Sequence, residues 1–324
     1  MTAAAGLIGA VTAQAAQVIR VQCPAQNLQN VIDNAPPGST LLVSGTCTGN
    51  FTITKNLNLA GLHATLDGNH AGTVVTVNQG VQTQLSNLTI THGNNINGGG
   101  ITNNGSLTLA HCTVTNNSAT NVGGVNGGGG IYNADARLTV SDSTVSGNTA
   151  SNPVGGSIGG GILTSGTMTL TRSTVTGNVA DVGGGIYHGG GTSTMTLSVV
   201  SRNTAHIEAG GFDTADGTVT LTTSTVSGNT SAQSGGIQAD GGTTRLNGSR
   251  VSFNTATGLG GGILVNFTST LVVSGSAVDH NHAGTDGGGI YKSPDTVVQL
   301  TRSQVFANTP NNCAPPGSVP GCTG

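Results

Sequence analysis

The side chains that could carry out acid–base chemistry gather in one short stretch of a nearly uncharged chain. The 324 residues include only 12 Asp and Glu and 9 Lys and Arg. Arg202, His206, Glu208 and Asp213 nevertheless lie close together in the sequence. Carboxylates and histidines are the groups that enzymes most often use to donate and accept protons. This stretch is therefore the first candidate for a catalytic site.

The same stretch is where a repeat along the chain is most disturbed. Glycine triplets followed by isoleucine recur in steps of 24 to 31 residues over most of the chain. They begin at Gly98, Gly128, Gly159, Gly183, Gly260 and Gly287, with weaker copies at Gly210-Gly211-Phe212 and Gly235-Gly236-Ile237. Departures from such a rule tend to fall at functional or strained positions. The disturbance therefore strengthens the case for a site near Asp213.

The second half of each repeat predicts short strands. Copies of the segment that begins at Leu138 begin at Leu107, Met168, Met195, Val219, Thr244, Leu271 and Val298. Apolar residues in them alternate with Thr and Ser, the period of a strand with one buried face. A repeat of this length indicates a stacked solenoid. The prediction is an all-β fold with one coil per repeat and an asparagine ladder at a corner, from Asn117 to Asn308.

Both ends of the chain have features of a secreted protein. Residues 1–16 are small and apolar and close on Ala13-Gln14-Ala15, as a signal peptide does. We expect an N-terminal cap and first coil over 17–60, solenoid coils over 61–309 and a Pro- and Cys-rich tail over 310–324. A short helix over Leu28–Ala35 would cover the first coil. Two disulfides, Cys23–Cys47 and Cys313–Cys322, would fasten the ends, and Cys112 would be a buried column residue.

The composition excludes two classes of partner. Scattered single Lys and Arg residues do not form the basic surface that nucleic acid requires. No apolar run is long enough to cross a membrane as a helix. A small molecule or an oligosaccharide is the expected substrate, and the oligomeric state is left open.

These patterns resemble the pectate-lyase-like superfamily. Gly-Gly-Gly-Ile-Tyr-Asn and Ser-Thr-Val-Ser-Gly-Asn-Thr-Ala are similar to the repeats of polymorphic outer-membrane proteins and of secreted actinobacterial proteins. The resemblance implies a single right-handed parallel β-helix. Pectate lyases of this superfamily hold calcium with clustered aspartates and use a basic residue as the base. The sequence shows no such cluster, so we expect no metal and no cofactor.

A row of outward-facing residues defines the expected groove. It follows the buried isoleucines and reads Tyr132, Leu163, Tyr187, Asp213, Gln238, Leu264 and Tyr291. We assign catalysis to Asp213, Glu208, Tyr187 and His188. Substrate binding is assigned to the rest of the row together with Arg202, Phe212 and Asp240. Glycine, which has no side chain, would form the floor of a long and mostly neutral groove.

Three functions fit this groove. The first is an enzyme that preorganises a neutral substrate, such as a cyclase that acts by cycloaddition on a polyketide-like natural product. The second is a polysaccharide lyase or hydrolase, which requires Glu208, Asp213 and Asp240 to converge. The third is a non-catalytic surface or adhesion module. Two minor alternatives are a metal site at Asp279, His280, His282 and Asp286, and ice binding by repeated Thr triplets.

Overall fold

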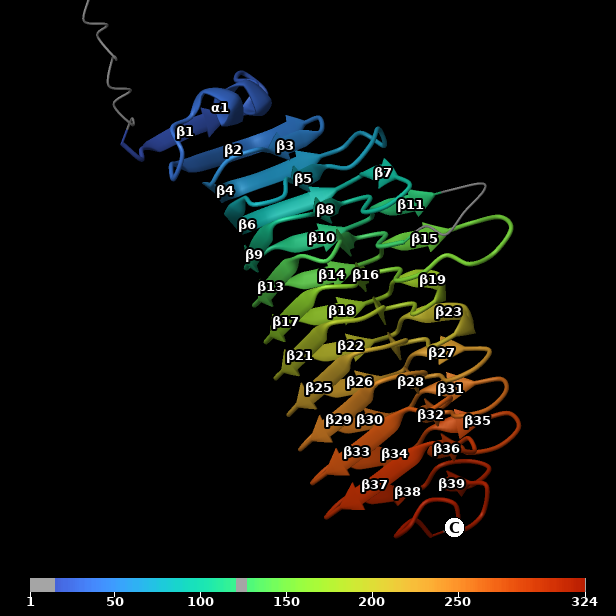
Figure 1. The fold of residues 1–324 in the computed structure, drawn as a ribbon. Coiled ribbons are helices and arrows are strands. Elements are labelled where there is room, and N and C mark those ends of the chain that lie inside the picture. The colour runs from blue at the N-terminus through green and yellow to red at the C-terminus, as the bar shows by residue number, and fades with distance from the viewer. Residues whose placement is uncertain (1–14, 121–126, 324) are drawn as a thin grey trace, which may run out of the picture.

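The chain folds into a single β-solenoid in the computed structural model, which describes residues 15–120 and 127–323. Successive coils stack along one axis, with the helix α1 (Leu28–Asn34) at one end and the C-terminus at the other (Figure 1). Every strand pair assigned in the three sheets is parallel. The fold is thus the predicted all-β parallel β-helix with a short N-terminal helix.

Three parallel sheets form the walls of the solenoid. The 20-stranded sheet contains β1 (Val18–Gln22), β2 (Thr40–Thr48), β4 (Leu57–Asp67), β6 (Gln82–Thr91), β9 (Ser106–Ala110), β10 (Thr113–Thr115), β13 (Arg137–Ser141), β14 (Thr144–Ser146), β17 (Thr167–Thr171), β18 (Thr174–Thr176), β21 (Thr192–Thr196), β22 (Val199–Ser201), β25 (Thr218–Thr222), β26 (Thr225–Ser227), β29 (Thr243–Asn247), β30 (Arg250–Ser252), β33 (Thr270–Ser274), β34 (Ala277–Asp279), β37 (Val297–Thr301) and β38 (Gln304–Phe306). The 11-stranded sheet contains β3 (Phe51–Ile53), β5 (Val75–Val77), β8 (Ile101–Asn103), β12 (Ile131–Asn133), β16 (Ile162–Thr164), β20 (Ile186–His188), β24 (Phe212–Thr214), β28 (Ile237–Ala239), β32 (Ile263–Val265), β36 (Ile290–Lys292) and β39 (Cys313–Ala314). The 8-stranded sheet contains β7 (Asn94–Asn95), β11 (Ser118–Thr120), β15 (Thr149–Ser151), β19 (Val179–Val182), β23 (Thr204–Glu208), β27 (Thr230–Ser231), β31 (Thr255–Ala256) and β35 (His282–Ala283).

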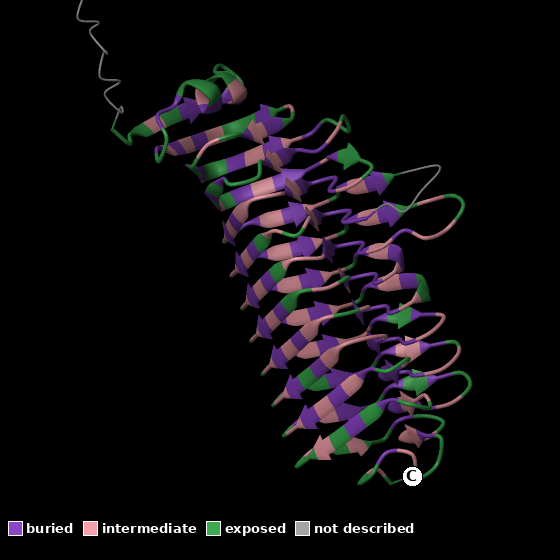
Figure 2. Ribbon diagram, in the orientation of Figure 1, coloured by how far each residue is buried: buried purple, intermediate pink, exposed green. Residues whose placement is uncertain are grey.

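The core is a column of apolar side chains inside the coils. Buried and half-buried residues alternate along the strands, as the two-residue period predicts (Figure 2). Each coil therefore buries its inner face on the coils above and below, and the elongated chain needs no single compact core.

An asparagine ladder closes one corner of every coil from Asn117 to Asn308. The Asn148 side-chain amide donates to Asn178 Oδ1 at 3.0 Å and to the Val114 carbonyl at 3.0 Å. The Asn148 backbone N–H donates to the same Asn178 oxygen at 2.9 Å. Buried polar groups are costly unless they are hydrogen-bonded, and here each coil supplies the partner of the next. The predicted ladder is confirmed.

Glycine is required at the neighbouring corner for two different reasons. Gly128 adopts a φ of +64°, which residues with a side chain rarely adopt. At Gly129, an added Cβ would lie 2.5 Å from the carbonyl oxygens of both Gly160 and Thr149. The coils therefore approach one another too closely here for any other residue.

The ends of the solenoid are fastened as the sequence predicted. The Asn27 side chain caps α1 by accepting a hydrogen bond from the Asn30 N–H at 3.0 Å. The Cys23–Cys47 and Cys313–Cys322 disulfides are both present, and Cys112 is a buried free thiol. Most of the predicted signal segment, residues 1–14, lies outside the described residues. No described helix is long and apolar enough to cross a membrane.

Candidate functional site

The predicted outward row lies along the middle of the 11-stranded sheet. Strand pairing places its members opposite one another in the order Tyr132, Leu163, Tyr187, Asp213, Gln238, Leu264 and Tyr291. A second row, on the segments that lead into this sheet, contains Ile158, Val182, Glu208 and Gln233. An added Cβ at Gly127, in the second row, would lie 2.7 Å from the Leu163 side chain. The two rows therefore pack against each other.

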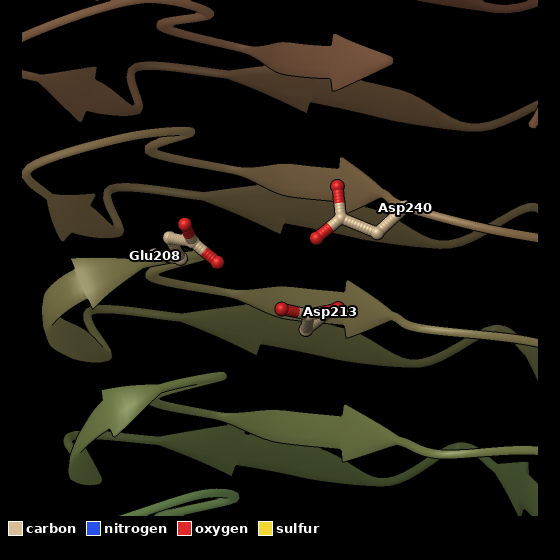
Figure 3. A group of neighbouring side chains, drawn as sticks. All are labelled: Glu208, Asp213 and Asp240. Carbon is tan, nitrogen blue, oxygen red and sulfur yellow. The ribbon is translucent and has the colours of Figure 1, made fainter. Parts of the chain in front are cut away.

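Three carboxylates from neighbouring coils converge where these rows meet. Glu208 ends β23, Asp213 is central in β24, and Asp240 directly follows β28. One oxygen from each carboxylate lies within 4.8 Å of the others. Figure 3 shows Glu208 and Asp240 reaching toward Asp213 from opposite sides. We call these three residues the carboxylate trio.

Gln238 holds two members of the carboxylate trio in place. Its Nε2 donates to Glu208 Oε2 at 3.0 Å and to Asp240 Oδ2 at 2.7 Å. The Gln238 side chain is 1% exposed, so solvent does not compete for these bonds. The predicted binding residue Gln238 is therefore placed to fix the distance between two carboxylates.

Burial raises the pKa of each carboxyl group of the trio. Burial raises the pKa of Asp213 well above its ordinary range, and the negative charges of Asp240 and Glu208 raise it further. Burial also raises the pKa of Glu208 and of Asp240, although hydrogen bonds to their charged forms oppose the shift. Burial, followed by the three carboxylates, raises the pKa of Tyr187. No basic group of the described chain is among the charges that act on the trio.

The trio contains more hydrogen-bond acceptors than donors. Asp213 Oδ1, Gln238 Oε1 and Asp240 Oδ1 are buried and have no hydrogen-bond partner. Buried carboxylate and amide oxygens without donors suit either shared protons or a hard divalent cation, which prefers oxygen ligands. The residues present therefore fit a calcium-like ion. The sequence showed no aspartate cluster because Asp213 and Asp240 belong to successive coils and lie far apart along the chain.

The outward row, expected to form an open shelf, is more buried than the sequence indicated. Asp213 is 1% exposed, and its apolar neighbours along the row, Leu163 and Leu264, are 8% and 3% exposed. Tyr187, Glu208 and Asp240 are half-buried. A substrate would therefore meet the edges of these three side chains, while Asp213 lies behind them.

Three predicted site residues lie elsewhere. His188 points into the solenoid, is 0% exposed and contacts Ser193 Oγ through Nδ1 at 2.9 Å. Phe212 is also 0% exposed and replaces isoleucine in the core. Arg202 is exposed on the turn before β23, at the opposite end of that strand from Glu208. The positions of His188 and Phe212 follow from strand alternation, which directs residues on either side of an outward residue inward, whereas Arg202 lies in a turn outside any strand.

The second charged patch does not converge on a common centre. Arg250 pairs with the buried carboxylate of Asp279, which also accepts from His280 Nδ1 at 2.8 Å. His282 instead contacts Thr309, and Asp286 accepts from Asn311. Sequence reasoning also missed Asn266, which hydrogen-bonds Asp240 from the next coil. No sequence signal marks Asn266, because it follows β32 in a turn of variable composition.

Comparisons with known proteins show likeness in fold. No protein-family model and no curated protein matches the sequence. The structure is similar to that of pectate lyase Pel9A, with a TM-score of 0.45 and 12% identity over 94% of this chain and 80% of the lyase. It is also similar to the pectin methylesterase from Aspergillus niger, with a TM-score of 0.36 and 11% identity over 89% and 85%. At these identities and TM-scores the likeness carries no conclusion about family or activity, and the parallel β-helix is shown by the strand pairing of this chain itself.

Proposed function

We propose that this protein is a secreted enzyme that hydrolyses a neutral polysaccharide. The convergence of Glu208, Asp213 and Asp240 is the observation that carries the proposal. Glycoside hydrolysis requires one carboxylic acid to protonate the leaving oxygen and a second carboxylate to attack or to activate water. The absence of a basic group among the described charges acting on the trio favours an uncharged glycan over an acidic one.

The environments of the carboxylates suggest a role for each. Gln238 favours the charged forms of both Glu208 and Asp240, whereas the Asn266 side chain adds a second such interaction at Asp240 alone, so Asp240 is assigned as the base or nucleophile. The negative charge of Asp240 raises the pKa of Glu208, so Glu208 is the acid. Asp213 lies buried behind both, and its raised pKa favours the protonated form. Tyr187 borders the same site and is placed to contact the sugar.

The short separation favours a double displacement. Glu208 would protonate the glycosidic oxygen as the bond from that oxygen to the anomeric carbon breaks, and Asp240 would form a bond to the same carbon. The leaving sugar would depart as an alcohol that carries the proton from Glu208. Water would then displace Asp240 and return a proton to Glu208. Retaining enzymes place their two carboxyl groups roughly 5–5.5 Å apart, whereas inverting enzymes need roughly 6.5–9.5 Å. Oxygens within 4.8 Å of one another fit the shorter range.

A cation-dependent polysaccharide lyase is the second candidate. The three partnerless oxygens of Asp213, Gln238 and Asp240 favour it, since they could hold a divalent cation. Such an ion, when bound, would neutralise the carboxylate of an acidic sugar. The expected cyclase rested on a mostly apolar groove with few charges. The convergence of three carboxylates supports either form of polysaccharide cleavage over it.

Secretion is part of the proposal because two disulfides suit an oxidising compartment.

The test is a panel of neutral and acidic polysaccharides with two readouts. Hydrolysis releases reducing ends alone, whereas a lyase also produces an unsaturated sugar with ultraviolet absorbance. Asp240→Asn and Glu208→Gln should each lower the rate by at least about a hundredfold. Asp135→Asn is the matched control, because Asp135 is exposed and its φ of +48° suits asparagine.

The outcomes separate the candidates. Reducing ends from a neutral glycan, insensitive to a chelator, support the hydrolase. Unsaturated product that disappears with a chelator and returns with calcium supports the lyase. No cleavage of any glycan contradicts both and leaves the non-catalytic adhesion module.

A further inference from the structure

One exposed phenylalanine lies beside the carboxylate trio. Phe267 is 69% exposed, in a chain with only 5 Phe, 3 Tyr and no Trp. The other two exposed phenylalanines have partners: Phe253 stacks on His280 with ring centroids 5.0 Å apart, and Phe306 meets His280 edge-on at 6.0 Å. Phe267 has no ring or cation partner within the described chain. Its ring is the one that remains open to a ligand.

The turn that carries Phe267 is fixed directly to the neighbourhood of Asp240. Strands β28 and β32 pair with Ala239 opposite Val265, so Asp240 and Asn266 are adjacent. The Asn266 N–H donates to the Ala239 carbonyl at 2.8 Å, and its side chain hydrogen-bonds Asp240. Ser269 Oγ also donates to the Ala239 carbonyl at 2.8 Å. One hydrogen bond before Phe267, from Asn266, and one after it, from Ser269, therefore tie the turn to the end of β28, directly before Asp240.

The backbone of Phe267 is unusual for a bulky residue. Its φ is +51°, a region that large side chains seldom occupy. Neither burial nor a ring contact in the described chain compensates for this conformation. The same conformation occurs at exposed Phe253 and Leu197, so the case for Phe267 rests on its exposure and on its position next to Asn266.

We propose that Phe267 is a sugar-binding platform of the site formed by the carboxylate trio. The face of a phenyl ring carries partial negative charge and attracts the weakly positive C–H groups on one face of a pyranose ring. Successive coils lie about 4.8 Å apart, close to the length of one sugar unit. Phe267, one coil beyond Asp240, would contact the sugar next to the bond being cleaved. This inference rests on the proposed function, because it assigns a neutral glycan to the same site.

Phe253 supplies a matched control for testing this platform. It is 58% exposed and has a φ of +56°, so Phe253→Asn and Phe267→Asn make the same change in the same backbone conformation. Asparagine tolerates this conformation, and neither substitution opens a cavity. Phe267→Tyr is the conservative variant, since it keeps an aromatic face.

The experiment measures glycan affinity without requiring turnover. Each variant is run by affinity electrophoresis through gels that contain the neutral glycans of the panel. Aromatic contacts of this kind correspond to about three- to tenfold in affinity. Phe267→Asn should weaken glycan binding by that factor, whereas Phe253→Asn and Phe267→Tyr should bind like the wild type. Where cleavage is measurable, Phe267→Asn should raise KM by the same factor and change kcat little.

Each outcome is informative about Phe267 separately from the proposed hydrolysis. Unchanged affinity of Phe267→Asn, an equal loss in Phe253→Asn, or no binding of the wild type to any glycan would overturn the platform. Cleavage that is abolished by Asp240→Asn but unaffected by Phe267→Asn would retain the proposed function and reject the platform. Binding that depends on Phe267 without any cleavage would retain the platform and reject the hydrolase.

Discussion

Acid should destabilise this solenoid through His188, and the size of the effect can be derived from its position. His188 lies inside the coils, and burial lowers its pKa from 6.5 to about 4. An unfolded chain would bind a proton at His188 near pH 6.5, while the folded protein would bind it only near pH 4. Between these pH values, protonation of His188 therefore lowers the free energy of the unfolded state more than that of the folded state. The stability that neutral His188 provides is complete above about pH 6.5 and is lost as the pH falls toward 4.

One pH unit of such a pKa difference corresponds to about 1.4 kcal/mol. The interval from 6.5 to about 4 therefore gives a loss of about 3 kcal/mol. The raised pKa values of the carboxylate trio act on the pH dependence of stability with the opposite sign. The informative quantity is therefore the difference between the wild type and a variant that changes His188 alone.

His188→Asn is the appropriate variant, because Asn133 occupies the equivalent inward position two coils earlier. The free energy of unfolding of both proteins is measured by urea denaturation from pH 8 to pH 4. We expect the variant to be less stable at pH 8, because it packs less well. Its deficit should shrink by about 3 kcal/mol by pH 4, since asparagine does not titrate.

Parallel stability curves would refute this reasoning. A direct check is the NMR titration of the histidine ring protons, with His188→Asn identifying the resonance. A midpoint near 6.5 for that resonance would show that the His188 ring is solvated, whatever the denaturation curves show.

Further predictions concern the trio, the ladder and the disulfides. Asp213→Asn should raise the melting temperature at pH 7, because the raised pKa of buried Asp213 costs stability once the pH exceeds the pKa of this group in the unfolded chain. The gain in melting temperature should vanish below about pH 4. A lower melting temperature at pH 7 would contradict this prediction. Asn203→Ala leaves the Asn178 N–H and side-chain amide without their acceptor, and should lower the unfolding free energy by about 2–4 kcal/mol, whereas half-buried Asn104→Ala should cost far less. Replacing Cys23 and Cys47 by serine opens a loop with a sequence separation of 24 and should lower the free energy of unfolding by about 3.5 kcal/mol. The same change at Cys313 and Cys322, with a sequence separation of 9, should lower it by about 2.7 kcal/mol. A larger loss from the second pair than from the first would argue that loop entropy is not the origin of the stabilisation.

Local patterns in the sequence were sufficient to predict the fold. The alternation of apolar residues, the glycine triplets and the asparagine column each act between a residue and its copy one coil away. Such contacts repeat with the sequence, so reading one coil gives the rest. The helix at Leu28 and the two disulfides were predictable for a related reason, because open solenoid ends need covering.

Which residues meet at the site depends on the strand register between coils, and this register cannot be read from the sequence. Glu208 meets Asp213 and Asp240 because a register shift in the pairing of β19 with β23 places Glu208 opposite Val182. The side on which a residue lies also changes with each step along a strand. His188 is next to outward Tyr187 and therefore faces inward, where it cannot touch a substrate in the groove.

The sequence by itself determined that the chain stacks repeated coils, fastens its ends and carries few charges, some of which lie close to Asp213 in the sequence. The tertiary structure alone decided which of those charges meet, because Asp240 comes from the coil after the one that holds Glu208 and Asp213, and it joins them only once the coils are stacked. It also placed Phe267 beside Asp240, through hydrogen bonds between turns that are separated by a whole coil. The repeated sequence specifies the solenoid because each contact joins a residue to its copy in the next coil. The site consists of residues that depart from the repeat, and the distances between them are set by the packing of the coils.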